Sequence, residues 1–368
     1  MGRIVTLSHC QAPCEGRGAC LPANWARSPA ECWVSGAEVA GGSSRSDDSG
    51  RRRSDTVPTV RRFGTALLIG VIALSACSDD PPDFEVADPI GNAEPGDVIA
   101  LRANGGAVEY VSRRTGEIRS FDTATDATQI LATIGVSTDG EQRGLLGHTV
   151  IDDRRFAAWT DPDTFDLVVG EVTSGSVDRM IWSGTGTQSK AVGGHLDTID
   201  GKILLGIGSL TDWANDHGSG AMVTLDPDGN EGQSPVVLSD GWNNPFAFTV
   251  LDDGTIWVAD NAPDGSDLPV AERDGERIAT TDATGPSLLE PPPQRAPSAI
   301  VELPDGRLGV CGFLDNEMRS YSLTDDGNLE RAGTIGPCLT GAAVLADGTI
   351  VTASTNDDGD AALLIRTP

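Results

Sequence analysis

Positive charge is scarce in this sequence of 368 residues, which has 26 Lys+Arg against 55 Asp+Glu. Only Lys190 and Lys202 are lysines. After residue 77 the chain keeps 26 − 9 = 17 basic and 55 − 6 = 49 acidic side chains, a formal charge of −32. A surface of this sign repels phosphate groups. Nucleic acid and anionic lipid headgroups are therefore excluded as binding partners.

Several catalytic signatures and long apolar runs are also missing. There is no Gly-x-Ser-x-Gly elbow, Walker loop or dinucleotide fingerprint, so serine-hydrolase and nucleotide chemistry have no support. Histidine occurs four times, as His9, His148, His195 and His217. The apolar run 63–76 is shorter than the about 20 residues that a membrane-spanning helix needs.

This apolar run has the three parts of an export signal. Arg61 and Arg62 precede it, and small residues end it just before Cys77 and a polar stretch. The sequence Leu-Ser-Ala-Cys at 74–77 resembles the lipobox of bacterial lipoproteins, in which the cysteine becomes the lipid-bearing N-terminus. We therefore expect an exported protein with a lipid on Cys77, held at the bacterial cell membrane on the cell surface or in the periplasm. A core helix ending in cysteine is the alternative.

The position of the signal divides the chain. An export signal must lead the chain, so residues 1–59 are expected to be a leader that is not normally made, with translation starting near Val57 or Val60. A disordered leader and a small zinc module are the alternatives. Residues 60–77 are then the signal peptide, 78–94 a flexible tether and 95–368 the delivered domain.

Cysteine is nearly absent from the delivered domain. Only Cys311 and Cys338 remain after residue 77. Outside the cytoplasm two remaining cysteines usually pair, so a Cys311–Cys338 disulfide is expected, with two separately buried thiols as the alternative.

A repeat indicates the fold. Six stretches combine a tight turn with an apolar strand, and they recur about 40–50 residues apart: 104–112, 152–160, 200–208, 253–260, 305–312 and 347–354. Most begin with Asp-Gly, which supplies the positive φ that a two-residue hairpin requires. The period and the lack of helical pattern predict an all-β, six-bladed β-propeller. A stacked β-sandwich array is the alternative.

Three segments carry a family resemblance: EQRGLLGHTVIDDRRFAAWTDPDTFDLVVGEV at 141–172, GGHLDTIDGKILLGIGSLTDWANDHGSGAMVTLDPDGN at 193–230 and DGWNNPFAFTVLDDGTIWVADNAPDG at 240–265. In this order they resemble the glucose/sorbosone dehydrogenase family. The resemblance implies a six-bladed propeller that oxidises aldoses with pyrroloquinoline quinone (PQQ), often together with Ca²⁺.

The sequence departs from this family where the chemistry is expected. Ala191 stands where the family has the histidine that takes the substrate proton, and His195 falls four residues later as the remaining catalytic candidate. The cofactor-contacting Arg-Asn-Pro of the family is Asn243-Asn244-Pro245 here. Asn244 and Asn243 are therefore the cofactor-binding candidates, without the arginine that would pair with a quinone carboxylate.

Other candidate residues follow from their type and position. Trp213 and Trp242 lie in expected loops and are substrate-stacking candidates, whereas Trp159 and Trp257 lie in expected strands and are assigned to the core. DGTIWVADN at 253–261 also suits gluconolactonase-like propellers, and Glu141, Asn244 and Asp260 are their corresponding metal-ligand candidates. The aspartate-rich loops are interpreted as turns rather than calcium sites.

These observations leave three hypotheses. The first is an extracytoplasmic PQQ-dependent aldose dehydrogenase with altered catalytic positions. The second is a non-catalytic propeller that binds a carbohydrate or a protein of the cell envelope. The third is a gluconolactonase-like, metal-dependent hydrolase. In each of these hypotheses, a monomer is expected.

Overall fold

The computed structural model describes residues 84–87, 90, 93–187, 189–208, 220–261, 276–282, 284–290, 295–325 and 327–368. They belong to the compact unit Asp80–Pro368. The leader, the export signal, Cys77, Trp213 and His217 lie outside these residues. The described part contains strands and no helix, and therefore no helix that could span a bilayer.

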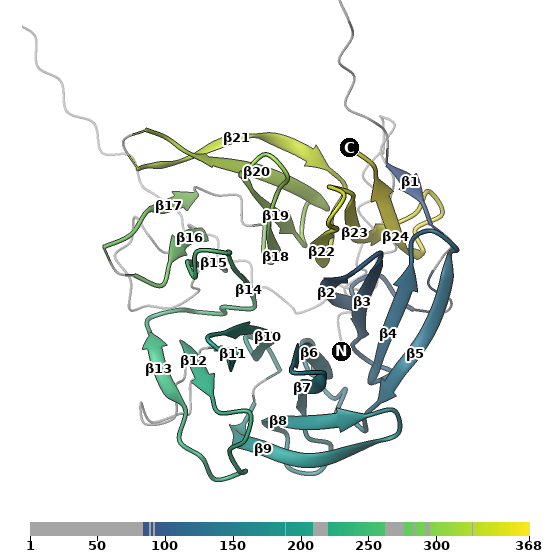
Figure 1. Cartoon of the computed structure of the whole chain (residues 1–368), viewed down its shortest axis with the longest axis vertical. Helices are drawn as coiled ribbons and strands as arrows, with labels where there is room; N and C mark the ends of the chain where they lie inside the picture. The colour runs from purple at the N-terminus through teal and green to yellow at the C-terminus, as the bar shows by residue number, and fades with distance from the viewer. Residues whose placement is uncertain are drawn as a thin grey trace, which may run out of the picture. The chain divides into compact units, whose positions relative to one another are not determined.

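Six four-stranded antiparallel sheets form a closed ring, so the prediction of a six-bladed propeller is confirmed (Figure 1). The first strand of each blade lies at the centre: β2 (Val98–Asn104), β6 (Leu145–Ile151), β10 (Gly193–Ile199), β14 (Ala247–Val250), β18 (Pro297–Glu302) and β22 (Gly341–Val344). The second strands are β3 (Ala107–Ser112), β7 (Arg154–Thr160), β11 (Lys202–Ile207), β15 (Ile256–Asp260), β19 (Leu308–Gly312) and β23 (Ile350–Thr355).

The two remaining strands of each blade lie further from the centre. The third strands are β4 (Glu117–Asp122), β8 (Asp166–Thr173), β12 (Ala221–Leu225), β16 (Glu276–Thr280), β20 (Glu317–Leu323) and β24 (Ala361–Arg366). The outer strands are β5 (Ala127–Thr133), β9 (Ser176–Gly186), β13 (Val236–Ser239), β17 (Ser287–Glu290), β21 (Leu329–Gly336) and β1 (Glu85–Val86). We number the blades 1 to 6 from β2 onward, so that blade 6 comprises β22, β23, β24 and β1.

Strand β1 closes the ring. Glu85 pairs with Ile365 and Val86 with Leu364, so the N-terminal side of the unit completes the C-terminal blade. Without this strand the edge of β24 would expose unpaired backbone groups. The expected tether 78–94 thus contains a strand of the propeller, and the propeller begins before residue 95.

The six sequence repeats are the hairpins that lead into the second strand of every blade. In blade 3 the predicted two-residue turn is present, with Asp200 and Gly201 both at positive φ. Blades 4, 5 and 6 instead share a longer loop around Gly254, Gly306 and Gly348. In blade 4, for example, the Gly254 N–H donates to the Leu251 carbonyl and the Leu251 N–H to the Thr255 carbonyl, at 2.9 Å each. The number of residues in the loop, and not the Asp-Gly pair, therefore sets the loop type.

Apolar side chains fill the space between blades. Six clusters of buried residues occur, one between each pair of adjacent blades. On β15, Trp257 and Ala259 pack toward blade 5, whereas Ile256 and Val258 pack toward blade 3. The second strands are therefore buried on both faces, and the assignment of Trp159 and Trp257 to the core is confirmed.

The topology gives the ring two faces. We call the face at which the inner strands begin the upper face, and the face that carries the hairpins between first and second strands the lower face. The upper face also carries the connections from second to third strands. The residues that the family resemblance singles out, 191 and 243–244, precede β10 and β14 and therefore lie at the upper face.

Candidate functional site at the upper face

Asn244 joins the starts of three blades. It lies just before β14 and is only 4% exposed. Its side-chain oxygen accepts the Gly193 N–H at 3.1 Å, and its Nδ2 donates to Gln142 Oε1 at 3.4 Å. Gln142 precedes blade 2 and Gly193 begins blade 3. The side-chain amide of Asn244 therefore links the segments at which blades 2, 3 and 4 begin, at the upper end of the channel.

Asp260 supports this arrangement from the end of β15. Its carboxylate accepts the Asn244 N–H at 2.7 Å and the Asn243 N–H at 2.9 Å. Arg277 lies 3.5 Å from the same carboxylate. Burial raises the pKa of Asp260 to about 6, because the two N–H groups and Arg277 offset only part of the cost of a buried charge. Asp260 thus orders the Asn243–Asn244 turn, and both of its carboxylate oxygens are occupied by hydrogen bonds.

The Asp260→Asn variant is expected to change how stability depends on pH. The folded pKa, about 6, lies above the unfolded value, about 3.9, so this group contributes stability that is present below about pH 4 and lost as the pH rises through 6. Asparagine does not titrate. The unfolding free energy of the variant minus that of the wild type should therefore rise by about 2–3 kcal/mol between pH 4 and pH 7.

Urea denaturation at both pH values measures this difference. Asp325→Asn, which removes a carboxylate at an exposed position on the lower face, is the matched control. A pH-independent difference for Asp260→Asn would show that the folded protein does not hold the Asp260 proton in this window.

Trp242, a predicted stacking residue, is enclosed. The residue is 6% exposed, and its Nε1 donates to Ser239 Oγ at 2.8 Å. The guanidinium of Arg277 lies 4.0 Å from the ring centroid and also donates to the Gly241 carbonyl. One face of the indole is therefore occupied by a cation and is not an open platform for a sugar. The other predicted platform, Trp213, lies outside the described residues.

Ala191 lies next to this cluster. It precedes Val192 and Gly193, whose N–H groups point to Gln142 and Asn244. Its φ is +52°, and a Cβ added to Gly208 would overlap its carbonyl group. The backbone is thus held closely, but the side chain is a methyl group. Position 191 offers no proton acceptor.

His195 does not take the place of the missing histidine. It lies within β10, with its ring 4.6 Å from that of Phe248 in an edge-on contact and its Nδ1 buried without a partner. Burial, followed by the nearby His148 and Arg102, lowers its pKa to about 3. The imidazole is neutral and belongs to the interior of the channel rather than to the Asn244 cluster.

The three metal-ligand candidates have separate roles. Glu141 is 59% exposed at its side chain and pairs with Lys190 at 3.2 Å. Asp260 is buried against backbone N–H groups, and Asn244 is bound to Gly193. Among the described residues no group of three His, Cys, Asp or Glu could hold a metal ion. The geometry therefore does not assemble a gluconolactonase-like centre or a calcium site from these side chains.

The arginines described at this face are all engaged by the protein. Arg113 pairs with Asp97 at 3.0 Å and donates to the carbonyl groups of Glu141 and Arg143. Arg143 donates to the Asp139 carbonyl at 2.7 Å, and Arg295 pairs with Asp315. PQQ carries three carboxylates, which need cations or free donors. The described residues do not fit this cofactor, because the donors of these arginines are already engaged: those of Arg113 and Arg295 by aspartates, and those of Arg143 by Asp139 and Thr187.

Sequence reasoning missed Phe313, an aromatic ring at this face. It follows β19 of blade 5, is 44% exposed, and lies 3.1 Å from where a Cβ on Gly96 would stand, at the entrance to blade 1. Leu314 beside it is 62% exposed. The sequence offers one indication, which is that Phe313 and Leu314 directly follow the strand of the fifth repeat. They therefore belong to a connection between a second and a third strand, and these connections lie at the upper face.

Solved structures with similar architecture support the fold. A glucose dehydrogenase-type oxidoreductase from Thermus thermophilus has a TM-score of 0.59 at 18% identity, covering 77% of this chain and 99% of that chain. The PQQ-bound aldose sugar dehydrogenase of Streptomyces coelicolor has a TM-score of 0.57 at 18% identity, covering 77% and 98%. These structures share the six-bladed propeller fold of this chain.

A third structure, the PQQ domain of pyranose dehydrogenase from Coprinopsis cinerea, has a TM-score of 0.51 at 13% identity, covering 78% of this chain and 97% of that chain. No protein-family model and no curated protein matches the sequence. The comparisons thus confirm the fold that the family resemblance implied, and at these identities they show the fold alone.

Proposed function

We propose that this protein is an exported, lipid-anchored propeller that binds a carbohydrate of the cell envelope at its upper face and does not oxidise it. One observation carries the proposal. The frame that positions the catalytic segment, made by Gln142, Asn244 and Asp260, is in place around a residue, Ala191, that has no acid–base group.

Charge supports the same conclusion. The arginine that would meet a quinone carboxylate is Asn243, whose N–H is bound to Asp260. Arg113 and Arg295 are paired with Asp97 and Asp315. A neutral sugar needs no free cation, whereas a tricarboxylate does. The exposed ring of Phe313 offers an apolar surface against which the C–H face of a sugar can pack.

Two assays test the proposal. In the first, the purified full-length chain is incubated with PQQ and Ca²⁺, and dye reduction is followed with a panel of aldoses, beside a known PQQ sugar dehydrogenase. We expect no turnover above the background without PQQ. Sustained turnover of any aldose would replace the proposal with the dehydrogenase hypothesis. In the second, an array of envelope polysaccharides and their oligosaccharides is probed, and binding to none of them would overturn the carbohydrate proposal.

Phe313→Ala is expected to weaken the affinity for the glycan identified on the array at least tenfold, about 1.4 kcal/mol, because the stacking surface is lost. Isothermal titration calorimetry measures the change. Leu323→Ala is the matched control, since Leu323 is 55% exposed but ends β20 at the lower face. Equal affinities for Phe313→Ala and wild type would place the glycan elsewhere.

A further inference from the structure

A second feature, unrelated to the upper-face cluster, is a cavity of about 220 Å³ in the central channel. The inner strands of all six blades contribute to it, and the polar side chains around it include Arg102, His148, His195, Asp197, Thr249 and Glu302. These residues run from the middle of their strands toward the lower ends. The cavity is large enough for a small organic molecule and too small for a sugar acid together with a cofactor.

Arg102 is the cation of this cavity. It lies on β2, is half-buried, and donates one hydrogen bond to the Thr149 hydroxyl on β6. Among the described residues no carboxylate lies within ion-pair distance of it. A guanidinium has five N–H donors, so most of its hydrogen-bonding capacity remains available. A partly desolvated cation with free donors favours an anionic ligand.

Glu109, the register partner of Arg102 across β2 and β3, does not supply that anion. Glu109 on β3 is 3% exposed and accepts hydrogen bonds from Arg155 at 2.7 Å, Asn104 at 2.8 Å and His148 Nε2 at 3.2 Å. Its pKa is about 2, because these donors outweigh the effect of its burial. The charge of Glu109 is therefore matched by Arg155 and not by Arg102.

Two imidazoles line the same cavity and have unused nitrogen atoms. His148 donates through Nε2 to Glu109, so its buried Nδ1 is left without a partner. The Nδ1 of His195 is also buried and has none. Unpaired buried polar atoms are uncommon in folded proteins and call for an explanation. Their position beside Arg102 at one cavity is the second, independent sign of a ligand site.

Two further carboxyl groups limit the charge of the ligand. Asp197 on β10 accepts the N–H of Thr198 at 2.8 Å and that of Val250 at 3.3 Å, and burial raises its pKa. Glu302 is exposed at the lower end of β18. In a ligand with two negative charges, the second charge would lie against one of these carboxyl groups and be repelled. A ligand with a single charge can place its carboxylate on Arg102 without this repulsion.

We propose that the lower half of the channel binds a small monocarboxylate, held by Arg102 beside His148 and His195. This site shares no residue with the upper-face cluster or with Phe313. It therefore stands independently of the proposed carbohydrate binding, and either proposal can fail without the other.

Calorimetric titration of the purified full-length chain with acetate, at constant ionic strength set with NaCl, tests the site. Acetate should bind with a dissociation constant on the order of millimolar, as expected for four non-hydrogen atoms. Acetamide, its neutral isostere, should not bind. Malonate and inorganic phosphate should bind at least tenfold more weakly than acetate. Acetamide binding as tightly as acetate, or malonate or phosphate doing so, would overturn the proposal.

Arg102→Gln should weaken acetate binding at least tenfold. Arg331→Gln, which removes the same charge from an arginine that is 46% exposed on β21, is the matched control and should leave it unchanged. A histidine-detected NMR titration of the wild type keeps the test independent of variant stability. Acetate should shift the imidazole signals of His148 and His195, and absence of a shift in both would exclude the channel as the site.

Discussion

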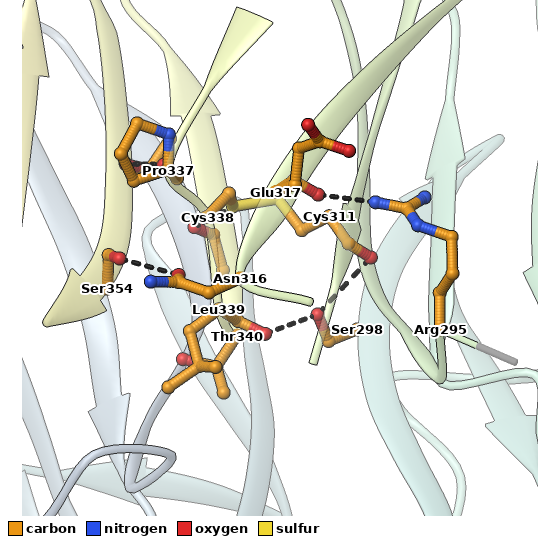
Figure 2. Close-up of a disulfide and its surroundings, with 12 residues drawn as sticks. Arg295, Ser298, Cys311, Asn316, Glu317, Pro337, Cys338, Leu339, Thr340 and Ser354 are labelled. Atoms are coloured by element: carbon orange, nitrogen blue, oxygen red, sulfur yellow. Dashed lines mark hydrogen bonds between the residues drawn. A yellow bond between two sulfur atoms is a disulfide. The ribbon is translucent and has the colours of Figure 1, made fainter. Parts of the chain in front are cut away.

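Replacing Arg295 with methionine is expected to lower the free energy of unfolding by about 3 kcal/mol, because it removes one partner of a buried ion pair. Arg295 is 1% exposed at the entrance to blade 5. Its Nε donates to Asp315 Oδ2 at 2.6 Å. Its Nη2 donates to the Glu317 carbonyl at 2.6 Å (Figure 2). Methionine keeps much of the apolar stem, so the change mainly reports the lost charge and hydrogen bonds.

The expected loss of unfolding free energy lies at the lower end of the range for broken buried ion pairs, and the surrounding groups explain why. Asp315 is 31% exposed, so water can partly solvate its carboxylate once the guanidinium is gone. The backbone N–H of Ala296 still donates to Glu276 at 2.6 Å, which holds the connection from blade 4 to blade 5 in place. The fold should therefore survive, with lower stability.

Guanidinium chloride unfolding of both proteins gives the difference. Arg307→Met is the matched control, since Arg307 also pairs with an aspartate, Asp305, at 2.6 Å, but both side chains are at least one-third exposed. An exposed pair of this kind contributes at most about 1 kcal/mol. Equal losses for the two variants would mean that burial of Arg295 adds nothing to its ion pair.

Removing the disulfide is expected to have an effect of similar size. Cys311 and Cys338 are bonded, with their Cα atoms 5.2 Å apart, and the prediction of this bond agrees with the structure. The bond joins β19 of blade 5 to the segment that enters blade 6 (Figure 2). For a separation of 27 residues, loop closure predicts a loss of about 3.5 kcal/mol on reduction.

The contacts around the disulfide indicate which part of the ring depends on this bond. The Ser298 hydroxyl lies 2.7 Å from the Leu339 carbonyl, and the Ser354 hydroxyl 2.7 Å from Asn316 Oδ1, so polar contacts join the two blades on both sides of the disulfide (Figure 2). Blade 6 is completed only by the short strand β1. We expect its amides to lose protection from hydrogen exchange first when the bond is removed.

The Cys311→Ala/Cys338→Ala double variant and reduced wild type should therefore unfold at similarly lower denaturant concentrations. The matched control is the effect of dithiothreitol on the double variant, which should be nil. If reduction of the wild type leaves its midpoint unchanged, the disulfide does not constrain the unfolded chain to the extent that loop closure predicts.

The candidate site was only partly foreseeable. The family motifs singled out Ala191, Asn243 and Asn244, and the structure brings them to one face because each precedes an inner strand and all inner strands begin there. No local pattern indicated that Arg277 covers Trp242, since blade 4 brings together residues 35 positions apart. Glu141 and Asp260 were candidates for one metal site, yet the fold uses one for an exposed ion pair and the other for a buried turn.

The channel site was invisible to sequence reasoning for a related reason. Nothing in the sequence of β6 shows that Arg102, from the neighbouring blade, donates a hydrogen bond to Thr149 beside His148. Positions on an inner strand face the channel or a neighbouring blade according to the ring geometry and the bulges. One such bulge lies between Ile99 and Arg102. A single-residue shift there changes which side chain enters the cavity.

The sequence by itself determined the number of blades, the all-β class and the second strand of each blade, because Asp-Gly turns and apolar strands are local properties of the chain. The closing strand was decided only by the tertiary structure, since two residues carry no periodicity and gain their pairing from Ile365 and Leu364 at the far end of the chain. The same holds for the charges. Composition sets how many there are, but burial and partners decide which are compensated and which remain available to a ligand.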